Sequence, residues 1–226
     1  MTTIDELIRK LQSANPRIRQ HAAYALGDIR NPRAVDALIH ALTNDTDADV
    51  RLRAANSLGR IGDRRALQPL IQALTNDSSA NVRRAAAEAF GKLGDRRATP
   101  WLIRSLGIDG DAYVRSAAAQ ALGALRDPNA IDALVRAIGD NSLVASAAIN
   151  ALARFPDPRV IPALLNVVAT PELYTGDVVE VALNTLRKHM LIHPDAILKL
   201  PTEDRNRLGR LLQDKYREEL QNELCK

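Results

Sequence analysis

The stretch from Asp45 to Asp63 reads Asp-Thr-Asp-Ala-Asp-Val-Arg-Leu-Arg-Ala-Ala-Asn-Ser-Leu-Gly-Arg-Ile-Gly-Asp, and it recurs along the chain. The counterparts of its Val50 follow one another at steps of 32, 30 or 34 residues, and they are Ile18, Val82, Val114, Val144 and Val178. A repeat of this length is typical of a solenoid, in which each unit buries its apolar face by stacking on its neighbours. The sequence therefore predicts one elongated repeat domain.

One helix of each repeat, which we call the B helix, is predicted to begin three residues before the Val50 column. A favoured N-cap residue stands there in every copy, and its side-chain oxygen can accept from a backbone N–H of the first turn. These residues are Asn15, Asp47, Ser79, Asp111, Asn141 and Thr175. Apolar positions then recur at i, i+4, i+8 and i+11, as on a helix with one buried face.

Small residues in the B helix predict close packing between neighbouring helices, because a larger side chain there would overpack the contact. The second apolar column is Ala in all six copies, at Ala22, Ala54, Ala86, Ala118, Ala148 and Ala182. A second close-approach column reads Gly27, Gly59, Gly91 and Gly123, and then Ala153 and Arg187.

A shorter A helix is predicted before each B helix, starting at Arg33, Arg65, Arg97, Asn129 and Arg159 in copies two to six. Its core column is Leu7, Leu38, Leu70, Leu102, Leu134 and Leu164. The sequence thus predicts an all-α solenoid of about six helical hairpins over residues 1–193. The predicted repeats span about 1–31, 32–63, 64–95, 96–127, 128–157 and 158–193.

Residues 194–226 depart from the repeat and predict a final helix that starts at Thr202. Leu208, Leu212, Tyr216, Leu220 and Leu224 recur every four residues along it. We expect this helix to cap the last repeat, because terminal repeats of solenoids need a polar outer cover. An amphipathic helix that binds a partner is the alternative.

The pattern Asp-x-Asp-x-x-Val-Arg-x-x-Ala-Ala-x-x-Leu-Gly-x-Ile-Gly-Asp-x-Arg-Ala between Asp45 and Ala66 resembles the HEAT-repeat superfamily, in particular the phycobilisome-lyase HEAT-like repeats. The resemblance covers roughly residues 4–190 and implies a right-handed α-solenoid. Repeats of this type serve both bilin lyase subunits and unrelated scaffolds. Likeness of fold alone does not assign a chemistry.

The composition restricts the classes of function. A formal charge of +4, from 31 Lys and Arg against 27 acids, is too small to indicate nucleic-acid binding by itself. The single cysteine, Cys225, allows no disulfide within the chain, as expected in a reducing cytosol. We see no signal peptide and no apolar run of transmembrane length, so the sequence predicts a soluble cytoplasmic protein without a membrane partner.

An arginine column and an aspartate column accompany the repeat. The arginines are Arg19, Arg51, Arg83 and Arg115, and the aspartates six positions before three of them are Asp45, Asp77 and Asp109. Both columns are lost together in copies five and six, which suggests that their members pair, within a repeat or with the next repeat. Ser13 stands before Arg19 and breaks the rule. We expect this ladder to be structural.

The sequence predicts neither catalytic residues nor a metal site. His21, His40, His189 and His193 form no His-Glu pair, and two histidines alone lack the further ligands of a closed zinc site. Phosphate-binding glycine loops and nucleophile elbows are absent as well. No cofactor is expected, apart from a bilin if the chain is a lyase subunit.

The best candidate binding residues are two outward columns of the B helices, expected on a concave surface. The first column is Tyr24, Asn56, Glu88, Gln120, Asn150 and Asn184, and the second contains Arg60, Lys92, Arg154 and Lys188 beside Asp28 and Ala124. Amides both donate and accept hydrogen bonds, as an extended peptide backbone requires. We therefore expect a non-catalytic scaffold that binds another protein, including an extended peptide segment, on this surface.

Two other functions stay open for the same surface. In a bilin lyase or phycobilisome-assembly subunit it would hold a phycobiliprotein and a tetrapyrrole, with Arg60, Lys92 and Arg154 meeting the propionates. The same cations could instead contact nucleic-acid phosphates. That alternative is the least favoured, because Asp28 and Glu88 interrupt the cations and Tyr24 is the one aromatic residue in these two columns for stacking.

Overall fold

The computed structural model describes residues 3–192, 195, 201–203, 205–206 and 208–210, and all regular structure among these residues is helical. The chain divides into two compact units, Met1–Arg154 and Phe155–Lys226, which we describe separately. The prediction of an all-α chain of repeated helical hairpins is confirmed.

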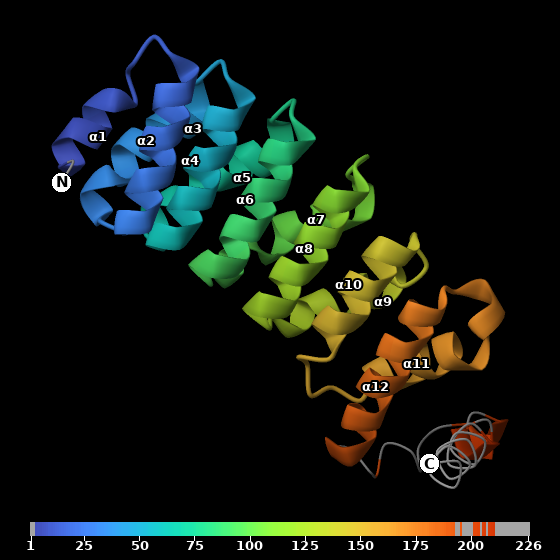
Figure 1. Cartoon of the computed structure of the whole chain (residues 1–226). Coiled ribbons are helices and arrows are strands. Elements are labelled where there is room, and N and C mark those ends of the chain that lie inside the picture. The colour runs from blue at the N-terminus through green and yellow to red at the C-terminus, as the bar shows by residue number, and fades with distance from the viewer. Residues whose placement is uncertain (1–2, 193–194, 196–200, 204, 207, 211–226) are drawn as a thin grey trace, which may run out of the picture. The chain divides into compact units, whose positions relative to one another are not determined.

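The first unit is a row of five hairpins, in which the B helices stand side by side in front of the A helices (Figure 1). The B helices are α2 (Pro16–Ile29), α4 (Ala48–Ile61), α6 (Ala80–Leu93), α8 (Ala112–Leu125) and α10 (Ser142–Leu152). The A helices are α1 (Ile4–Lys10), α3 (Val35–Asn44), α5 (Leu67–Asn76), α7 (Thr99–Ile108) and α9 (Ile131–Ala137).

Each A helix from α3 to α9 is preceded by one 3₁₀ turn, so the α-helix itself begins two residues later than the sequence suggests. These turns are η1 (Pro32–Ala34), η2 (Arg64–Ala66), η3 (Arg96–Ala98) and η4 (Pro128–Ala130). An Asn or Asp side chain accepts from the backbone N–H two residues on and starts each turn, as Asp63 does from Arg65 N at 2.9 Å.

The predicted N-caps of the B helices differ in what their side chains do. Asp47 Oδ1 accepts from Val50 N at 3.0 Å, and Asp111 and Asn141 make equivalent bonds, whereas Asn15 Oδ1 accepts from Arg17 N, one residue earlier in the first turn. Ser79 has the extended backbone of an N-cap, but its side chain makes no capping hydrogen bond. The prediction that the Ser79 side chain caps its helix is therefore wrong.

The B helices approach one another closely at the small residues. All six alanines of the Ala54 column are fully buried. A Cβ built on Gly59 would lie 2.7 Å from Ala89 Cα in the next B helix, which is closer than real atoms come. The hydroxyl of Ser57 on α4 donates to Ala23 O on α2 at 2.8 Å and ties these two helices together.

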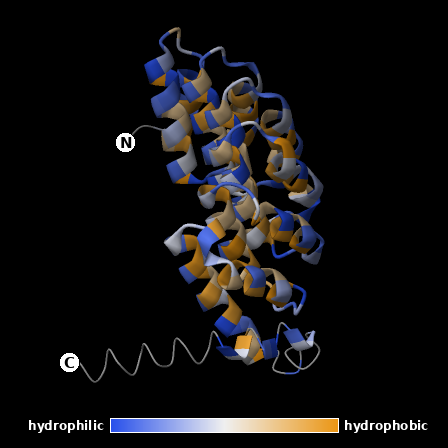
Figure 2. Cartoon of the chain, turned by 90° about the vertical axis from the view of Figure 1, so that its right-hand side faces the viewer, coloured by the Kyte–Doolittle hydropathy of each residue, from blue (hydrophilic) through white to orange (hydrophobic). Residues whose placement is uncertain are grey.

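The A helices pack less closely than the B helices, because neighbouring B helices contact each other extensively whereas consecutive A helices contact each other little. Hydrophobic and hydrophilic stretches alternate along the helices, and the loops are mostly hydrophilic (Figure 2).

The first copy departs from the expected core. Ile18 is 42% exposed, whereas Val50, Val82 and Val114 in the same column are fully buried. The difference arises because the first hairpin has a neighbouring hairpin on one side alone.

The second unit contains α11 (Val160–Ala169), the 3₁₀ turn η5 (Pro171–Leu173) and α12 (Gly176–Ile192). Its core includes Leu164, Ala182 and Leu186, and Leu208 is also buried. A helix starts after Pro201, whose carbonyl accepts from Arg205 N at 3.0 Å. The remaining apolar positions of the predicted capping helix, Leu212, Tyr216, Leu220 and Leu224, lie outside the described residues.

No helix within the described part of the chain has both the length and the hydropathy needed to cross a membrane.

Candidate binding face

Four arginine–aspartate pairs join the A-to-B loops of neighbouring hairpins in the first unit. In each pair the arginine Nε and Nη2 donate to both carboxylate oxygens, at 2.7 to 2.9 Å. The pairs are Arg19–Asp45, Arg51–Asp77, Arg83–Asp109 and Arg115–Asp140. We call this set the loop ladder, and its pairing is between repeats rather than within one.

Each arginine also binds the loop of its own repeat. Arg51 Nη1 donates to Asp45 O at 2.9 Å, while Asp77 Oδ1 accepts from Ser79 N at 2.9 Å. All three guanidinium nitrogens of the arginine and both carboxylate oxygens of the aspartate thus take part in hydrogen bonds. Together these bonds tie the loop of one hairpin to the loop of the next. These bonds account for the residue types at both columns without any ligand.

The geometry explains the exception at Ser13. Within its own loop, Arg19 binds backbone carbonyls, which any residue type provides. Ser13 O accepts from Arg19 Nη1 at 2.8 Å. The sequence analysis also missed Asp140, because the shortened loop of copy five places Gly139 at the aligned position. The ladder ends at Asp140, since Ala145 replaces the arginine of that copy.

The carboxylates of the loop ladder are held in their ionised form. Burial raises the pKa of Asp45, Asp77 and Asp109, but hydrogen bonds from the partner arginine and from a backbone N–H outweigh it, so each pKa lies below its usual value. The bond from Arg115 is the main cause that lowers the pKa of Asp140.

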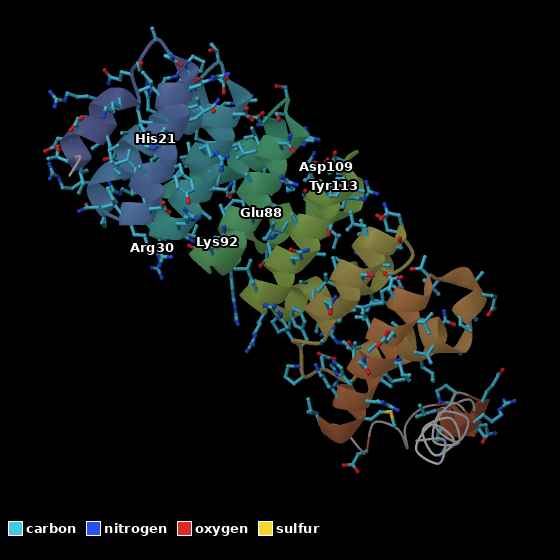
Figure 3. All side chains as sticks on the ribbon, in the orientation of Figure 1. His21, Arg30, Glu88, Lys92, Asp109 and Tyr113 are labelled. Atoms are coloured by element: carbon cyan, nitrogen blue, oxygen red, sulfur yellow. The ribbon has the colours of Figure 1, made fainter. Side chains whose placement is uncertain are left out.

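The two outward columns of the B helices reach solvent in the first unit, and together they form what we call the B-helix face. It consists of Tyr24, Asn56, Glu88, Gln120 and Asn150 and the edge residues Asp28, Arg60, Lys92, Ala124 and Arg154. Glu88 and Lys92 lie one turn apart on α6, on the side that faces the viewer in Figure 3. Asn184 and Lys188 are exposed on α12 of the second unit.

Charges on the B-helix face pair with one another more than the sequence suggests. Arg60 forms an ion pair with Asp28 of the preceding helix, and its guanidinium carbon lies 5.2 Å from the centre of the Tyr24 ring. The guanidinium carbon of Arg53 lies 5.8 Å from the centre of the same ring. Arg60 therefore already has an acidic partner and an aromatic neighbour within the first unit.

Lys92 and Arg154 are the edge cations of the first unit that form no ion pair among the described residues. They lie around a hollow of about 360 Å³, together with Glu88 and Gln120. Its floor is made of the small residues Gly91, Ala117, Ala121 and Ala124. The middle of the face thus carries a depression with small apolar residues in its lining and charged and amide side chains around it.

The amides of the B-helix face are unused within the protein. Asn56, Gln120 and Asn150 make no side-chain hydrogen bond to any residue that the structure describes, and all three are at least partly exposed. Amides elsewhere are engaged, since Asn15 and Asn141 cap helices and Gln20 donates to Asp47 at 3.1 Å. Donors and acceptors are therefore available at regular intervals along this face.

The three described histidines lie on different helices. His21 and His40 are exposed on α2 and α3, His189 is buried in α12, and His193 lies outside the described residues. Over the part of the chain that the structure describes, no three His, Cys, Asp or Glu side chains are grouped to hold an ion.

Comparisons with known proteins agree with this architecture. A chain in the complex of CpcE and CpcF of phycocyanin lyase from Nostoc sp. PCC7120 is 26% identical, with a TM-score of 0.61 over 95% of both chains. YibA of Escherichia coli is 26% identical, with a TM-score of 0.62 over 93% of this chain and 80% of that one. Importin beta, 16% identical with a TM-score of 0.61, covers 92% of this chain and shares the fold alone.

A search of curated proteins found no match. The sequence model of HEAT repeats matches residues 1–58, 35–123, 67–145 and 107–187, which together cover most of the 226 residues. The chain belongs to the HEAT-repeat family.

Proposed function

We propose that this protein is a non-catalytic scaffold that binds an extended segment of another protein on the B-helix face. The observation that carries the proposal is the set of amides without a partner among the described residues, Asn56, Gln120 and Asn150, on a surface where Asp28, Arg60 and Glu88 are paired. An amide side chain can donate to a peptide carbonyl and accept from a peptide N–H.

The spacing of these amides suits a peptide main chain. Stacked helices lie roughly 8 to 10 Å apart. An extended chain advances roughly 3.3 to 3.4 Å per residue, so a bound peptide that runs along the row passes one B helix about every two to three residues. Glu88 takes the place of an amide on α6, where it lies 3.7 Å from Arg84.

The charges of the face favour an acidic partner. Lys92 and Arg154 have no ion pair among the described residues, and both flank the depression on the B-helix face. Acidic side chains on alternate residues of the bound segment would point toward them. Because these cations are exposed, the attraction weakens as salt increases.

Mutation of the amides tests the proposal. Each neutral hydrogen bond contributes about 0.5 to 1.5 kcal/mol, so Asn56→Ala, Gln120→Ala and Asn150→Ala together should weaken a captured partner by about one to three decades. The partner is first identified by pull-down and mass spectrometry and then titrated by calorimetry. Gln12→Ala, Asn44→Ala and Asn129→Ala remove three exposed amides of the first unit away from the face and serve as the matched control. Equal affinity of both triple variants would refute the proposal.

A phycocyanin-lyase type of subunit is the second candidate function. Its support is the 26% identity to a chain of the CpcE–CpcF complex over 95% of both chains. Lys92 and Arg154 on opposite sides of one depression could meet the two propionates of a bilin, but aromatic side chains for its π-face are absent from that lining.

Colour distinguishes the two functions. The protein should copurify with visible absorbance from a bilin-producing system if the lyase function holds, and Lys92→Ala with Arg154→Ala should reduce that absorbance. A colourless preparation that still binds its protein partner supports the scaffold alone.

A further inference from the structure

A hollow of about 350 Å³ lies between α5 and α7, on the A-helix side of the first unit and away from the B-helix face. Ile71, Leu74, Trp101 and Ile108 line it with apolar surface. Trp101 is 37% exposed and Ile108 is 69% exposed, while Ile71 and Leu74 are buried at its floor. Two large apolar side chains are thus open to solvent around one depression.

The repeats provide an internal comparison for these residues. The positions equivalent to Trp101 are Ala37, Pro69 and Ala133, and those equivalent to Ile108 in copies two and three are Asn44 and Asn76. The hollows between α1 and α3 and between α7 and α9 contain no aromatic residue. The fold therefore does not need a tryptophan or an isoleucine here, and exposed apolar surface of this kind marks a contact site.

A buried hydroxyl in the same hollow has no hydrogen-bond partner among the residues that the structure describes. Ser105 is 7% exposed, and its Oγ makes no hydrogen bond, whereas Thr75 Oγ1 on α5 donates to Ile71 O at 2.9 Å. Its equivalents in other copies are Ala41, Ala73 and Ala137. The hydroxyl at this position is therefore a feature of this copy that the packing of the repeat does not require.

The charge of the lining favours an anion. Asp109 is occupied by Arg83, which donates to both of its oxygens at 2.8 and 2.9 Å. Arg104 is exposed and makes no ion pair or hydrogen bond through its side chain with any residue that the structure describes. The lining therefore presents one uncompensated positive charge beside its apolar surface.

We propose that this hollow is a second docking site, which takes one large apolar side chain of a partner segment with acidic residues next to it. The side chain packs against Trp101 and Ile108, and an acidic neighbour meets Arg104. A volume of about 350 Å³ is at the small end of ligand pockets, which suits one anchoring side chain better than a whole ligand. With the B-helix face on the other side of the row, the protein could hold two segments at once.

A peptide titration tests the site directly. Trp101 is the single tryptophan of the chain, so its fluorescence reports binding at this place. The probe is the acetylated and amidated pentapeptide Glu-Glu-Phe-Glu-Glu, and the controls replace every Glu with Gln or the Phe with Ala. We expect a saturable change with a dissociation constant on the order of 1 mM, and binding at least about tenfold weaker for both controls.

The variant Arg104→Gln, Ser105→Ala and Ile108→Asn converts the lining to the residues of copy three, Gln72, Ala73 and Asn76, and keeps Trp101 as reporter. Because the fold accommodates those residues one repeat earlier, the variant should fold and lose the saturable change. The single change Arg104→Gln at an exposed position should weaken binding and remove its salt dependence. Asn56→Ala, Gln120→Ala and Asn150→Ala on the B-helix face should leave the response intact, which separates this site from the proposed function.

Several results would overturn the proposal: no saturable change up to about 10 mM peptide, equal binding of the control peptides, or an undiminished response in the triple variant. Sedimentation equilibrium tests the other possible occupant, a second copy of the chain. If the wild-type protein forms a dimer that the triple variant does not form, the hollow holds a second copy of the chain, and the docking site for an acidic segment is wrong.

Discussion

Arg51 and Asp77 lie 26 residues apart in the chain and form a two-bond ion pair in which both side chains are largely buried, at 14% and 9% exposure. Arg51 reaches back to Asp45 O in its own loop and forward to Asp77 in the next loop. One side chain thus fixes the spacing of two successive hairpins, and four such pairs run along the first unit.

Removing the charge of Asp77 should destabilise the first unit strongly. Asp77→Asn retains an oxygen for Ser79 N but leaves the guanidinium of Arg51 without its counter-charge in a mostly buried place. We expect a loss on the order of 3 kcal/mol in the free energy of unfolding by urea.

The matched control is Asp36→Asn, because Asp36 also pairs with an arginine, Arg65, but both side chains are exposed, at 76% and 46%. Such a pair contributes about 0 to 1 kcal/mol. Equal effects of the two substitutions would show that the loop ladder adds no more than ordinary surface pairs.

Stability should fall in acid, and Asp95 offers a specific test. Hydrogen bonds from the Arg97 side chain lower the pKa of Asp95 to about 2. A carboxylate whose pKa is depressed on folding stabilises the protein above its unfolded pKa, and this contribution disappears as the pH falls through the folded value. The difference in unfolding free energy between the wild type and Asp95→Asn should therefore shrink between about pH 4 and pH 2.

Chemical denaturation at several pH values measures this difference. A gap between the two proteins that stays constant over the whole range would contradict the depressed pKa of Asp95.

The N-cap residues should separate into two groups. Asp47→Ala removes the bonds to Val50 N and to Gln20, at 3.0 and 3.1 Å, and should cost about 0.5 to 2 kcal/mol. Ser79→Ala should change the melting temperature little, because the Ser79 side chain makes no capping bond. A larger loss from Ser79→Ala than from Asp47→Ala would contradict this assignment.

Periodicity was enough to predict the hairpins, because every repeat satisfies the same apolar columns and the same turns. It could not decide which aspartate each arginine of the loop ladder meets. The aspartate 6 residues before an arginine and the one about 26 residues after it belong to the same repeating column. Asp140 was missed because a shorter loop shifts it by one position. The Arg60–Asp28 pair carried a readable signal, namely opposite charges at one column in consecutive copies.

The sequence also carried a signal for the hollow between α5 and α7, because Trp101 stands in a column of small residues. Aligning the A helices as closely as the B helices would have shown it. Whether such a residue is buried or exposed depends on the spacing of the A helices, which the repeat pattern does not specify.

The last prediction concerns the glycine column of the B helices, where the same substitution should have opposite effects in neighbouring repeats. A glycine in a helix costs about 0.5 to 1 kcal/mol relative to alanine, so Gly→Ala normally stabilises. At Gly91 the new Cβ would lie 3.4 Å from Ala121 Cα, an ordinary contact, and Gly91→Ala should raise stability by that amount. At Gly59 it would lie 2.7 Å from Ala89 Cα, so the helices must separate, and overpacking of this kind costs about 1 to 3 kcal/mol. Thermal and urea unfolding of both variants measure the two signs. A stabilised Gly59→Ala would show that α4 and α6 move apart without loss, and the close packing on the B-helix side would not then hold the row together.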